Sequence, residues 1–365
     1  MAYTDIDDPS AYFQTLLYTG NSANNRALVN DGNSDMQPDF VWIKDRTGTA
    51  TSSAAWHMLF DSSRGANGLS SNETAAEPSN QYNTMSSFDS DGFTILAGGN
   101  YINANNEPHV AWQWKANGGT TTNVSASGSG NTQIIASTHQ ANTDAGFSMV
   151  TFTAPDIGSG NNYTVSHGLG AVPEVIILKS RNITGNWHVY HQATGPNGVT
   201  FLNKTDAFYD NIYFADTTPS STVFTMGART ALDPDNTAVA YCFAEKQGYS
   251  KFGSYSGNGN NNGAFVYLGF SPSWLLVKRT NSAESWQLVD NKRSPINVMD
   301  EVIRPDNSGA ENSNQGGGDS IDFLSNGFKP RSSAGQFNNG NSTYIYMAFA
   351  EHPFVSSKGV PTTAR

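Results

Sequence analysis

The chain has 365 residues, of which only 14% are charged and 12% are aromatic, and its formal net charge is −11. This acidic balance, with only 20 Lys and Arg, disfavours nucleic-acid phosphate and anionic membrane surfaces as partners. The lone cysteine, Cys242, excludes an intrachain disulfide and a CxxC zinc site, and we interpret it as a small buried hydrophobe. Asn, Ser, Thr and 35 Gly supply the polarity instead, which favours an all-β chain with many short strands and long uncharged loops.

Three stretches of the chain share one pattern. Each begins at a proline, runs through an apolar segment and ends at a lysine six positions later, at 38–44, 173–179 and 272–278. A tryptophan, then a phenylalanine, then an aromatic strand follow in each unit; the markers are Trp56, Trp187 and Trp286, with Phe93, Phe224 and Phe328. A unit that recurs three times is first interpreted as an array of modules, so these residues are expected to build cores.

In chain order, the units predict three tandem antiparallel β-sandwich modules of jelly-roll type, related by an internal repeat. Module 1 spans 1–116, a Gly/Ser/Thr-rich linker 117–146, module 2 147–248, module 3 249–353 and a C-terminal tail 354–365. Composition predicts a flexible linker, interrupted at 133–135 by a short segment suited to adding a strand to a neighbour. The tail has no core of its own, so we expect it to be loose unless a partner holds it.

Within each unit, two strands differ in their pattern. The proline-to-lysine segments are continuously apolar, which predicts strands that are covered on both faces. Their last residues, Lys44, Lys179 and Lys278, are expected to cap them with a solvated charge. After each tryptophan the sequence alternates, so the tryptophan and the residue two places on are expected to share the core face.

The N-terminal residues are acidic and contain no apolar run, so we expect no secretion signal. No segment approaches the roughly 18–20 apolar residues of a membrane helix. We therefore expect a protein that is made in a cytoplasm and does not insert into membranes.

Several phrases of the sequence resemble a repeat family of bacteriophage virion proteins. They include Ser-His-Gly-Leu-Gly at 166–170, Val-Ala-Tyr-Cys-Phe-Ala-Glu at 239–245, the run at 248–259, and Tyr-Ile-Tyr-Met-Ala-Phe-Ala-Glu at 344–351. Members of that family occur chiefly in phages of marine bacteria and cyanobacteria, and are usually labelled tail fibre, appendage or structural protein. The resemblance, from about Tyr12 to Pro353, implies a structural protein on the virion exterior, and it brings no catalytic residues.

Enzymatic and metal-binding patterns are weak. Cleavage of polysaccharides needs two carboxylates at a set separation, and Glu245 and Glu351 lie beside aromatic residues. However, they occupy equivalent places in two units, which favours a structural role as partners of lysines. The run that begins at Asp31 resembles a calcium loop but has Met36 and Trp42 where that loop needs Gly and Glu, so we expect a turn. We expect no enzyme activity, metal or cofactor.

Long uncharged loops remain as candidates for recognition. Amide side chains on a rigid β scaffold suit hydrogen bonding to carbohydrate, whereas simple hydration of a particle surface is the alternative reading. The candidate recognition residues are Asn258, Asn260, Asn307, Asn312, Asn314, Gln315, Gln336, Asn338 and Asn339.

The sequence therefore predicts a non-enzymatic virion surface protein, made in the host cytoplasm and exposed on the particle exterior. The leading role is a tail-fibre or appendage adhesin that contacts the host envelope. A head decoration or knob protein that binds the major capsid protein is the alternative, and a polysaccharide depolymerase comes third. The expected partners are other virion proteins of tail or capsid and host-surface glycans, not nucleic acid.

Overall fold

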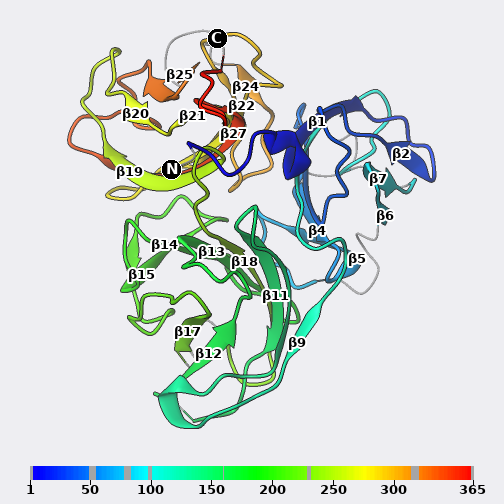
Figure 1. The fold of residues 1–365 in the computed structure, drawn as a ribbon, viewed down its shortest axis with the longest axis vertical. Coiled ribbons are helices and arrows are strands. Elements are labelled where there is room, and N and C mark those ends of the chain that lie inside the picture. Colours follow the sequence, from blue (N-terminus) through cyan, green and yellow to red (C-terminus); the bar gives the residue numbers. More distant parts are fainter. Residues whose placement is uncertain are drawn as a thin grey trace.

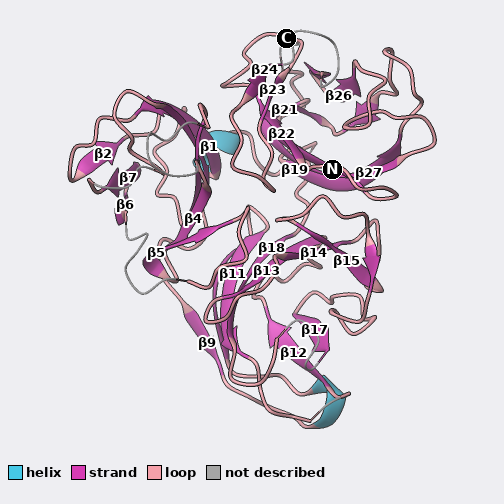
Figure 2. Ribbon diagram, turned by 180° about the vertical axis from the view of Figure 1, so that it is seen from behind, coloured by secondary structure: helices cyan, strands magenta, loops and turns pink. Residues whose placement is uncertain are grey.

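The computed structural model describes residues 3–48, 55–77, 84–97, 101–158, 160–227, 232–313 and 320–362. Within these ranges the chain is all-β, and its helical elements are two three-residue 3-10 turns, Pro9–Ala11 and Gly130–Thr132. Neither of these described helices could span a membrane. Figures 1 and 2 show three lobes, which in Figure 1 are coloured blue to cyan for module 1, green for module 2 and yellow to red for module 3.

Module 1 consists of a five-stranded sheet and a three-stranded sheet. In sheet order, the larger one contains β1 (Phe13–Thr19), β8 (Pro108–Trp114), β3 (Phe40–Asp45), β4 (His57–Asp61) and β5 (Gly65–Ser70). The smaller one contains β2 (Arg26–Leu28), β7 (Gly92–Ile95) and β6 (Met85–Asp89).

Module 2 has the widest sheet, with eight strands. In sheet order they are β16 (Tyr209–Asp210), β15 (Gly198–Phe201), β14 (His188–His191), β13 (Val175–Ser180), β18 (Thr237–Phe243), β11 (Phe147–Thr153), β10 (Ser137–Asn142) and β9 (Thr122–Val124). A two-stranded sheet of β12 (Asn162–Ser166) and β17 (Val223–Gly227) accompanies it.

Module 3 has a four-stranded sheet and two small ones. The larger sheet contains β19 (Ser250–Ser256), β27 (Thr343–Pro353), β21 (Phe270–Arg279) and β22 (Gln287–Asp290). The small sheets contain β20 (Val266–Tyr267), β26 (Gly327–Pro330) and β25 (Ile321–Leu324), and β23 (Glu301–Val302) with β24 (Asn312–Ser313).

The same strand order recurs in the three large sheets. The first strand of each unit pairs with the closing strand, which pairs with the proline-to-lysine strand and then with the strand after the tryptophan: β1-β8-β3-β4, β11-β18-β13-β14 and β19-β27-β21-β22. The markers Phe93, Phe224 and Phe328 lie in the equivalent strands β7, β17 and β26, and each is fully buried. This agreement supports the three-unit pattern read from the sequence.

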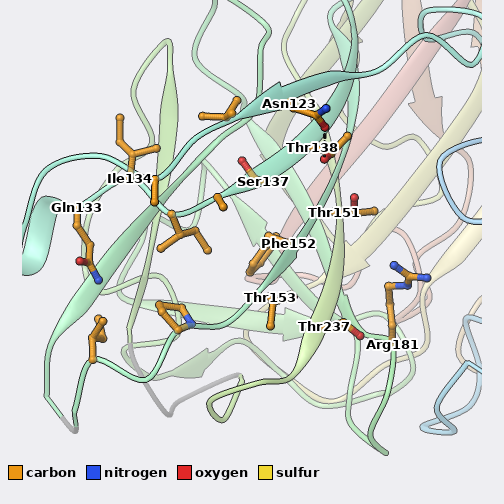
Figure 3. A pocket seen from close by; sticks show the side chains of 16 residues that line it. Asn123, Gln133, Ile134, Ser137, Thr138, Thr151, Phe152, Thr153, Arg181 and Thr237 are labelled. Carbon is orange, nitrogen blue, oxygen red and sulfur yellow. Dashed lines mark hydrogen bonds between the residues drawn. The ribbon is translucent and has the colours of Figure 1, made fainter.

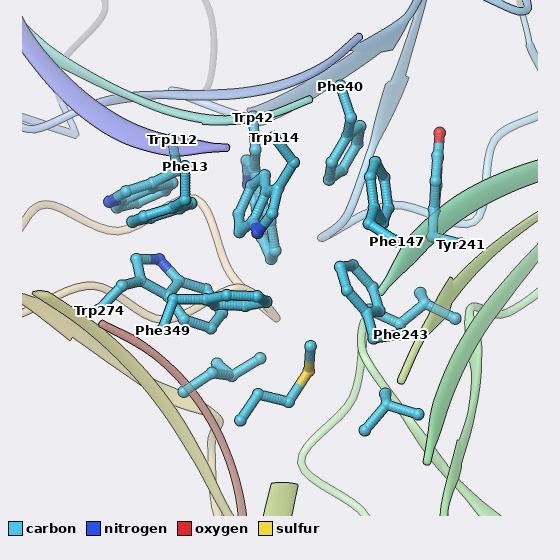
Figure 4. Packing of buried hydrophobic residues seen from close by; sticks show 14 of the residues in the cluster. Phe13, Phe40, Trp42, Trp112, Trp114, Phe147, Tyr241, Phe243, Trp274 and Phe349 are labelled. Carbon is cyan, nitrogen blue, oxygen red and sulfur yellow. The ribbon is translucent and has the colours of Figure 1, made fainter. Parts of the chain in front are cut away.

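Both faces of each large sheet are covered, as the apolar proline-to-lysine segments predict. Every residue of β3 and β13 is buried. One face of each sheet packs on a core within its own module. The other face meets a central cluster to which all three modules contribute large aromatic side chains (Figure 4). Since burial of one such side chain contributes about 1.5–3 kcal/mol, this shared cluster is a major source of stability.

Three aromatic side chains from the closing strands meet in the central cluster. The ring of Trp114 lies 6.4 Å from that of Phe243 and 5.6 Å from that of Phe349. The rings of Phe243 and Phe349 are 6.0 Å apart. Each pair has the edge-on geometry that aromatic rings favour, so one residue from each module completes a closed triangle.

Hydrogen bonds between modules recur in cyclic order around this triangle. The indole Nε1 of Trp187 (module 2) donates to the carbonyl of Ser70 (module 1) at 2.8 Å, and that of Trp286 (module 3) donates to Phe201 (module 2) at 2.9 Å. His57 of module 1 closes the ring, because its Nε2 lies 3.0 Å from the carbonyl of Arg304 in module 3. Each module thus contacts the other two.

His57, rather than Trp56, takes the position of the other two tryptophans. The backbone N–H of His57, like those of Trp187 and Trp286, donates over 2.9 Å to the side chain of an Asn or Asp: Asn72, Asn203 and Asp306 in turn. Trp56 is half-buried and stacks on Tyr101 beside the core of module 1. The residue of module 1 that is equivalent to Trp187 and Trp286 is therefore His57, not Trp56 as the sequence predicted. A shift of one residue along a strand moves a side chain to the opposite face of the sheet.

The three lysines lie at the module boundaries and are buried, not solvated as the sequence predicted. The Nζ of Lys179 donates to the carbonyls of Thr74 and Gly185, and that of Lys278 to the carbonyls of Thr205 and Glu284. Burial lowers the pKa of Lys44, Lys179 and Lys278 to about 8. At two lysines the bonds to a neighbouring module's carbonyl offset part of the desolvation cost.

Two of the three boundaries also contain a buried ion pair. Asp61 pairs with Arg64 and accepts the hydroxyl of Tyr241 from module 2 at 2.7 Å. Asp290 pairs with Arg293 at 2.6 Å and accepts the indole N–H of Trp112 from module 1 at 2.9 Å. At the boundary between modules 2 and 3, His191 Nε2 and the carbonyl of Tyr346 meet instead, 3.1 Å apart.

The predicted linker and tail are both built into the fold. Segment 117–146 contains β9 and β10, which extend the sheet of module 2 because β10 pairs with β11 and β9 pairs with β10, so it is not a free linker. Ile134 lies in segment 133–135, which was expected to add a strand to a neighbour, and it forms a β-bridge to Thr164. In the tail, Ser357 donates to Asp7, and the N–H of Phe354 donates to Gly269 at 3.1 Å. Composition predicted flexibility here because it does not reveal such long-range bonds.

The hydrogen bonds between modules predict different roles for Trp187 and Trp56. We expect Trp187→Phe to lower the free energy of unfolding by about 2–4 kcal/mol, because it removes the buried indole hydrogen bond to the carbonyl of Ser70 and leaves packed volume unfilled. Trp56→Phe keeps the stack on Tyr101, so we expect a loss of at most about 1 kcal/mol. Urea unfolding of both variants would measure the difference, and equal losses would contradict the assigned equivalence.

Candidate functional site

The described residues show no constellation typical of catalysis or metal binding. Among them, no group of three or more His, Cys, Asp or Glu is placed to hold a metal ion. Asp31 forms an ion pair with Lys292 at 3.0 Å, across the boundary between modules 1 and 3. Glu245 forms an ion pair with Lys251 at 3.3 Å, and the carboxylate of Glu351 lies 3.7 Å from the Nε2 of His352.

Most of the histidines are buried and have structural hydrogen bonds. The Nδ1 of His57 accepts the indole N–H of Trp42, so its Nε2 carries the proton that is donated to Arg304. His167 Nε2 lies 3.1 Å from the carbonyl of Ser220. Burial lowers the pKa of His167 and His191 to about 4 and that of His188 to about 3, so these rings are neutral at pH 7. Neutral rings bonded to backbone are part of the scaffold.

The predicted recognition residues fall into two groups. Asn258, Asn260, Asn338 and Asn339, with Gln336 just before them in the chain, belong to one loop pair of module 3. Asn307 and Asn312 flank residues that contact module 1: Glu311 pairs with Arg46 at 2.7 Å. Asn314 and Gln315 lie outside the described residues.

The amides of the module 3 loop pair bond mainly to one another. Asn338 is fully buried, and its Nδ2 donates to the side chain of Asn258 at 2.8 Å and to the carbonyl of Asn260 at 2.7 Å. Asn338 thus shapes the loop and is not available to a ligand, contrary to the expectation from sequence. Asn258 and Asn260 are exposed, but their Oδ1 atoms accept backbone N–H groups of the same loop.

A groove of about 690 Å³ in module 2 is a stronger candidate. Three strands, β9, β10 and β11, contribute to it, with the segments 133–136 and 155–157 and the residues Arg181 and Thr237. Figure 3 shows Gln133 and Ile134 on one side, Arg181 and Thr237 on the other, and Phe152 between them. The strands that bear it belong to the sheet that packs on the central cluster, so its floor is rigid.

The groove combines uncommitted polar groups with an apolar floor. Ser137 is only 7% exposed, and its Oγ has no hydrogen-bond partner among the described residues. The side chains of Gln133, Thr151, Thr153 and Thr237 also line the groove and have no hydrogen bond within the described ranges. Apolar contacts are offered by Ile134, Ile135, Phe152, Pro155 and Ile157. A buried hydroxyl without a partner is costly, so a ligand or water that bonds to Ser137 would be favoured.

The charge of the groove argues for binding rather than catalysis. None of its lining residues is Asp or Glu. The one charged residue, Arg181, pairs with Glu77 of module 1 at 2.6 Å, so its charge is balanced. Hydroxyl, amide and apolar groups without an acid or base suit an uncharged polar ligand that presents both hydroxyls and C–H faces.

Sequence reasoning missed this groove because its wall lies in the segment read as a linker. The one signal was the apolar pair Ile134-Ile135 within a Gly/Ser/Thr-rich stretch, which suggested an added strand. That β9 and β10 join β11 depends on pairing with residues that the local composition does not indicate.

The fold and the groove define a class: an all-β protein of three packed antiparallel sandwich modules with a surface groove. The chain belongs to the family described as Domain of unknown function (DUF7483), whose model matches residues 8–353. No curated protein and no solved structure matches the chain. The matched range spans all three modules.

The buried histidines predict loss of stability in mild acid. Burial lowers the pKa of six of them: His57, His109, His139, His167, His188 and His191. In the unfolded chain these histidines bind protons near pH 6.5, whereas in the folded chain they bind protons only at lower pH, at about pH 4 for His167 and His191 and about pH 3 for His188. Stability therefore falls as the pH falls below 6.5 toward these values. Burial raises the pKa of Glu174 to about 7 and also raises the pKa of Glu301 and Asp306, so these three carboxyl groups oppose the trend.

We therefore expect the melting temperature to fall steeply between pH 6.5 and 4.5. Calorimetry across this range would measure it. His352→Gln should leave the trend intact, because that ring is 39% exposed. A melting temperature that is unchanged down to pH 4.5 would refute the expectation.

Proposed function

We propose that the chain is a non-enzymatic surface protein of a bacteriophage virion, which acts as a tail-fibre or appendage adhesin and binds glycans of the host envelope. Its repeated sequence phrases resemble those of phage virion proteins, and this resemblance supports a place on the virion. Its partners in the particle are other tail or capsid proteins, and it is made in the host cytoplasm before assembly on the exterior.

The groove of module 2 is the observation that supports glycan binding. Saccharides present hydroxyls for hydrogen bonds and C–H faces for apolar contact, and the groove offers Ser137, Gln133 and three threonines around Phe152. The supporting strands are fixed by ladders across β9, β10, β11 and β18. A preformed site loses little conformational entropy when a ligand binds, which favours useful affinity from a modest contact area.

A depolymerase would need a general acid and a second carboxylate around the scissile bond. The lining of the groove offers neither. Binding without cleavage therefore fits these residues better than hydrolysis does.

Substitutions at the groove test the binding role. Thr153→Trp should fill the groove and weaken binding to a host-derived glycan at least tenfold, and Gln133→Ala should weaken it several-fold by removing hydrogen bonds. Thr19→Trp is the matched control, because Thr19 is an exposed threonine at the end of β1. An array of host-derived envelope glycans would provide the measurement. Silence of the wild-type protein on that array would overturn the adhesin role, and equal binding by all variants would exclude the groove as its binding site.

The location on the particle tests the choice between tail and head. An antibody against the protein, coupled to gold, should label the tail or its appendages in electron micrographs of virions. Gold on the head would replace the proposed role with that of a decoration protein bound to the major capsid protein.

A further inference from the structure

A second cleft lies where modules 2 and 3 meet both ends of the described chain. It has a volume of about 470 Å³. Four segments converge on it: the N-terminal arm, the junction of the two modules, the turn after β20 and the start of the tail; the lining residues used below are Tyr3, Glu245, Gln247, Lys251 and Tyr267. We propose that this cleft is a second, independent saccharide site, at which a neutral pyranose ring stacks on tyrosine.

Two tyrosines give the cleft its aromatic surface. Tyr3 is 59% exposed and Tyr267 is 58% exposed, although they are more than 260 positions apart in the sequence. Neither side chain has a hydrogen bond within the described part of the chain. Exposed rings with polar hydroxyl ends can stack on the C–H face of a sugar and bond to its hydroxyls with the same side chain.

One wall of the cleft supplies charged hydrogen-bonding groups. Glu245 and Lys251 form an ion pair at 3.3 Å in which the side chains are 32% and 31% exposed. Gln247 lies between them in the chain and is exposed. A carboxylate, an ammonium and an amide side by side can accept from and donate to neighbouring hydroxyls, and charge-assisted bonds of this kind are stronger than neutral ones. The pair is neutral overall, which favours an uncharged sugar.

The cleft is preformed because its walls are tied together. Thr4, next to Tyr3, is buried and donates its hydroxyl to the carbonyl of Gln247 at 3.0 Å. Gly248 has φ +78°, and a Cβ there would come within 2.5 Å of the Thr4 hydroxyl, so the arm fits only against glycine. On the opposite side, Phe354 donates to Gly269 at 3.1 Å. A ligand would therefore meet fixed walls, and binding would order little of the chain.

This cleft differs from the groove of module 2 in its chemistry. The groove offers hydroxyls and an apolar floor with a balanced arginine, whereas the cleft offers exposed aromatic rings and an ion pair. The two share no lining residue. The two sites can therefore be tested separately, and either can fail alone.

The test uses the full chain and three neutral probes: maltohexaose, cellohexaose and chitohexaose. Saturation-transfer NMR would identify the probe that binds, and titration calorimetry would give its affinity. For the bound probe, Tyr267→Ala and Tyr3→Ala should each raise Kd at least tenfold, whereas Tyr267→Phe should stay within about threefold because the stacking ring remains. Tyr209→Ala, at a tyrosine in β16 that is 52% exposed and outside the cleft, should leave Kd unchanged.

The variant Thr153→Trp separates the two sites. If it leaves this Kd unchanged while Tyr267→Ala weakens binding, the cleft is confirmed whatever the fate of the groove. If Thr153→Trp abolishes binding and the tyrosine variants do not affect it, the cleft proposal fails and the groove stands. Absence of saturation transfer to all three probes also overturns the proposal. The proposal fails too if Tyr267→Ala protein binds sugar normally but is not incorporated into virions, because the cleft would then be a contact with another protein.

Discussion

The fold depends on the contact between the closing strands of the three modules. Trp114, Phe243 and Phe349 meet edge to face, and each belongs to a sheet whose inner surface is apolar. An isolated module would expose that surface to water, since its own small sheet covers only the other face. The modules are therefore interdependent parts of one ring, in agreement with a family match that runs from residue 8 to residue 353.

Charge is scarce in the chain and is concentrated where it positions one module against another. Asp61 and Asp290 each hold an arginine and also accept a hydrogen bond from an aromatic side chain of the next module. Such buried pairs add directionality that apolar packing lacks, because the hydrogen bonds are satisfied in one arrangement. The rigid ring that results holds the strands of the groove and the walls of the cleft in place.

The sequence predicted the parts of the fold that follow from short patterns. Continuous apolar runs between Pro and Lys became strands buried on both faces, and Phe93, Phe224 and Phe328 became equivalent core residues. What it missed depends on partners far along the chain. Lys179 and Lys278 are buried where a neighbouring module supplies a carbonyl. His57, one residue after Trp56, takes the place that the sequence assigned to Trp56. The groove escaped prediction for the same reason, since β10 pairs with β11 and β9 is added beside β10.

Joining three similar modules in one polypeptide frees each from the symmetry of its neighbours. A ring assembled from three identical chains would have to display any added hairpin three times. In this chain the strands β9 and β10 occur beside one large sheet, among the residues described, and the groove they border has a single copy. A tandem chain can thus keep the packing of a trimer while one of its three modules diverges from the other two.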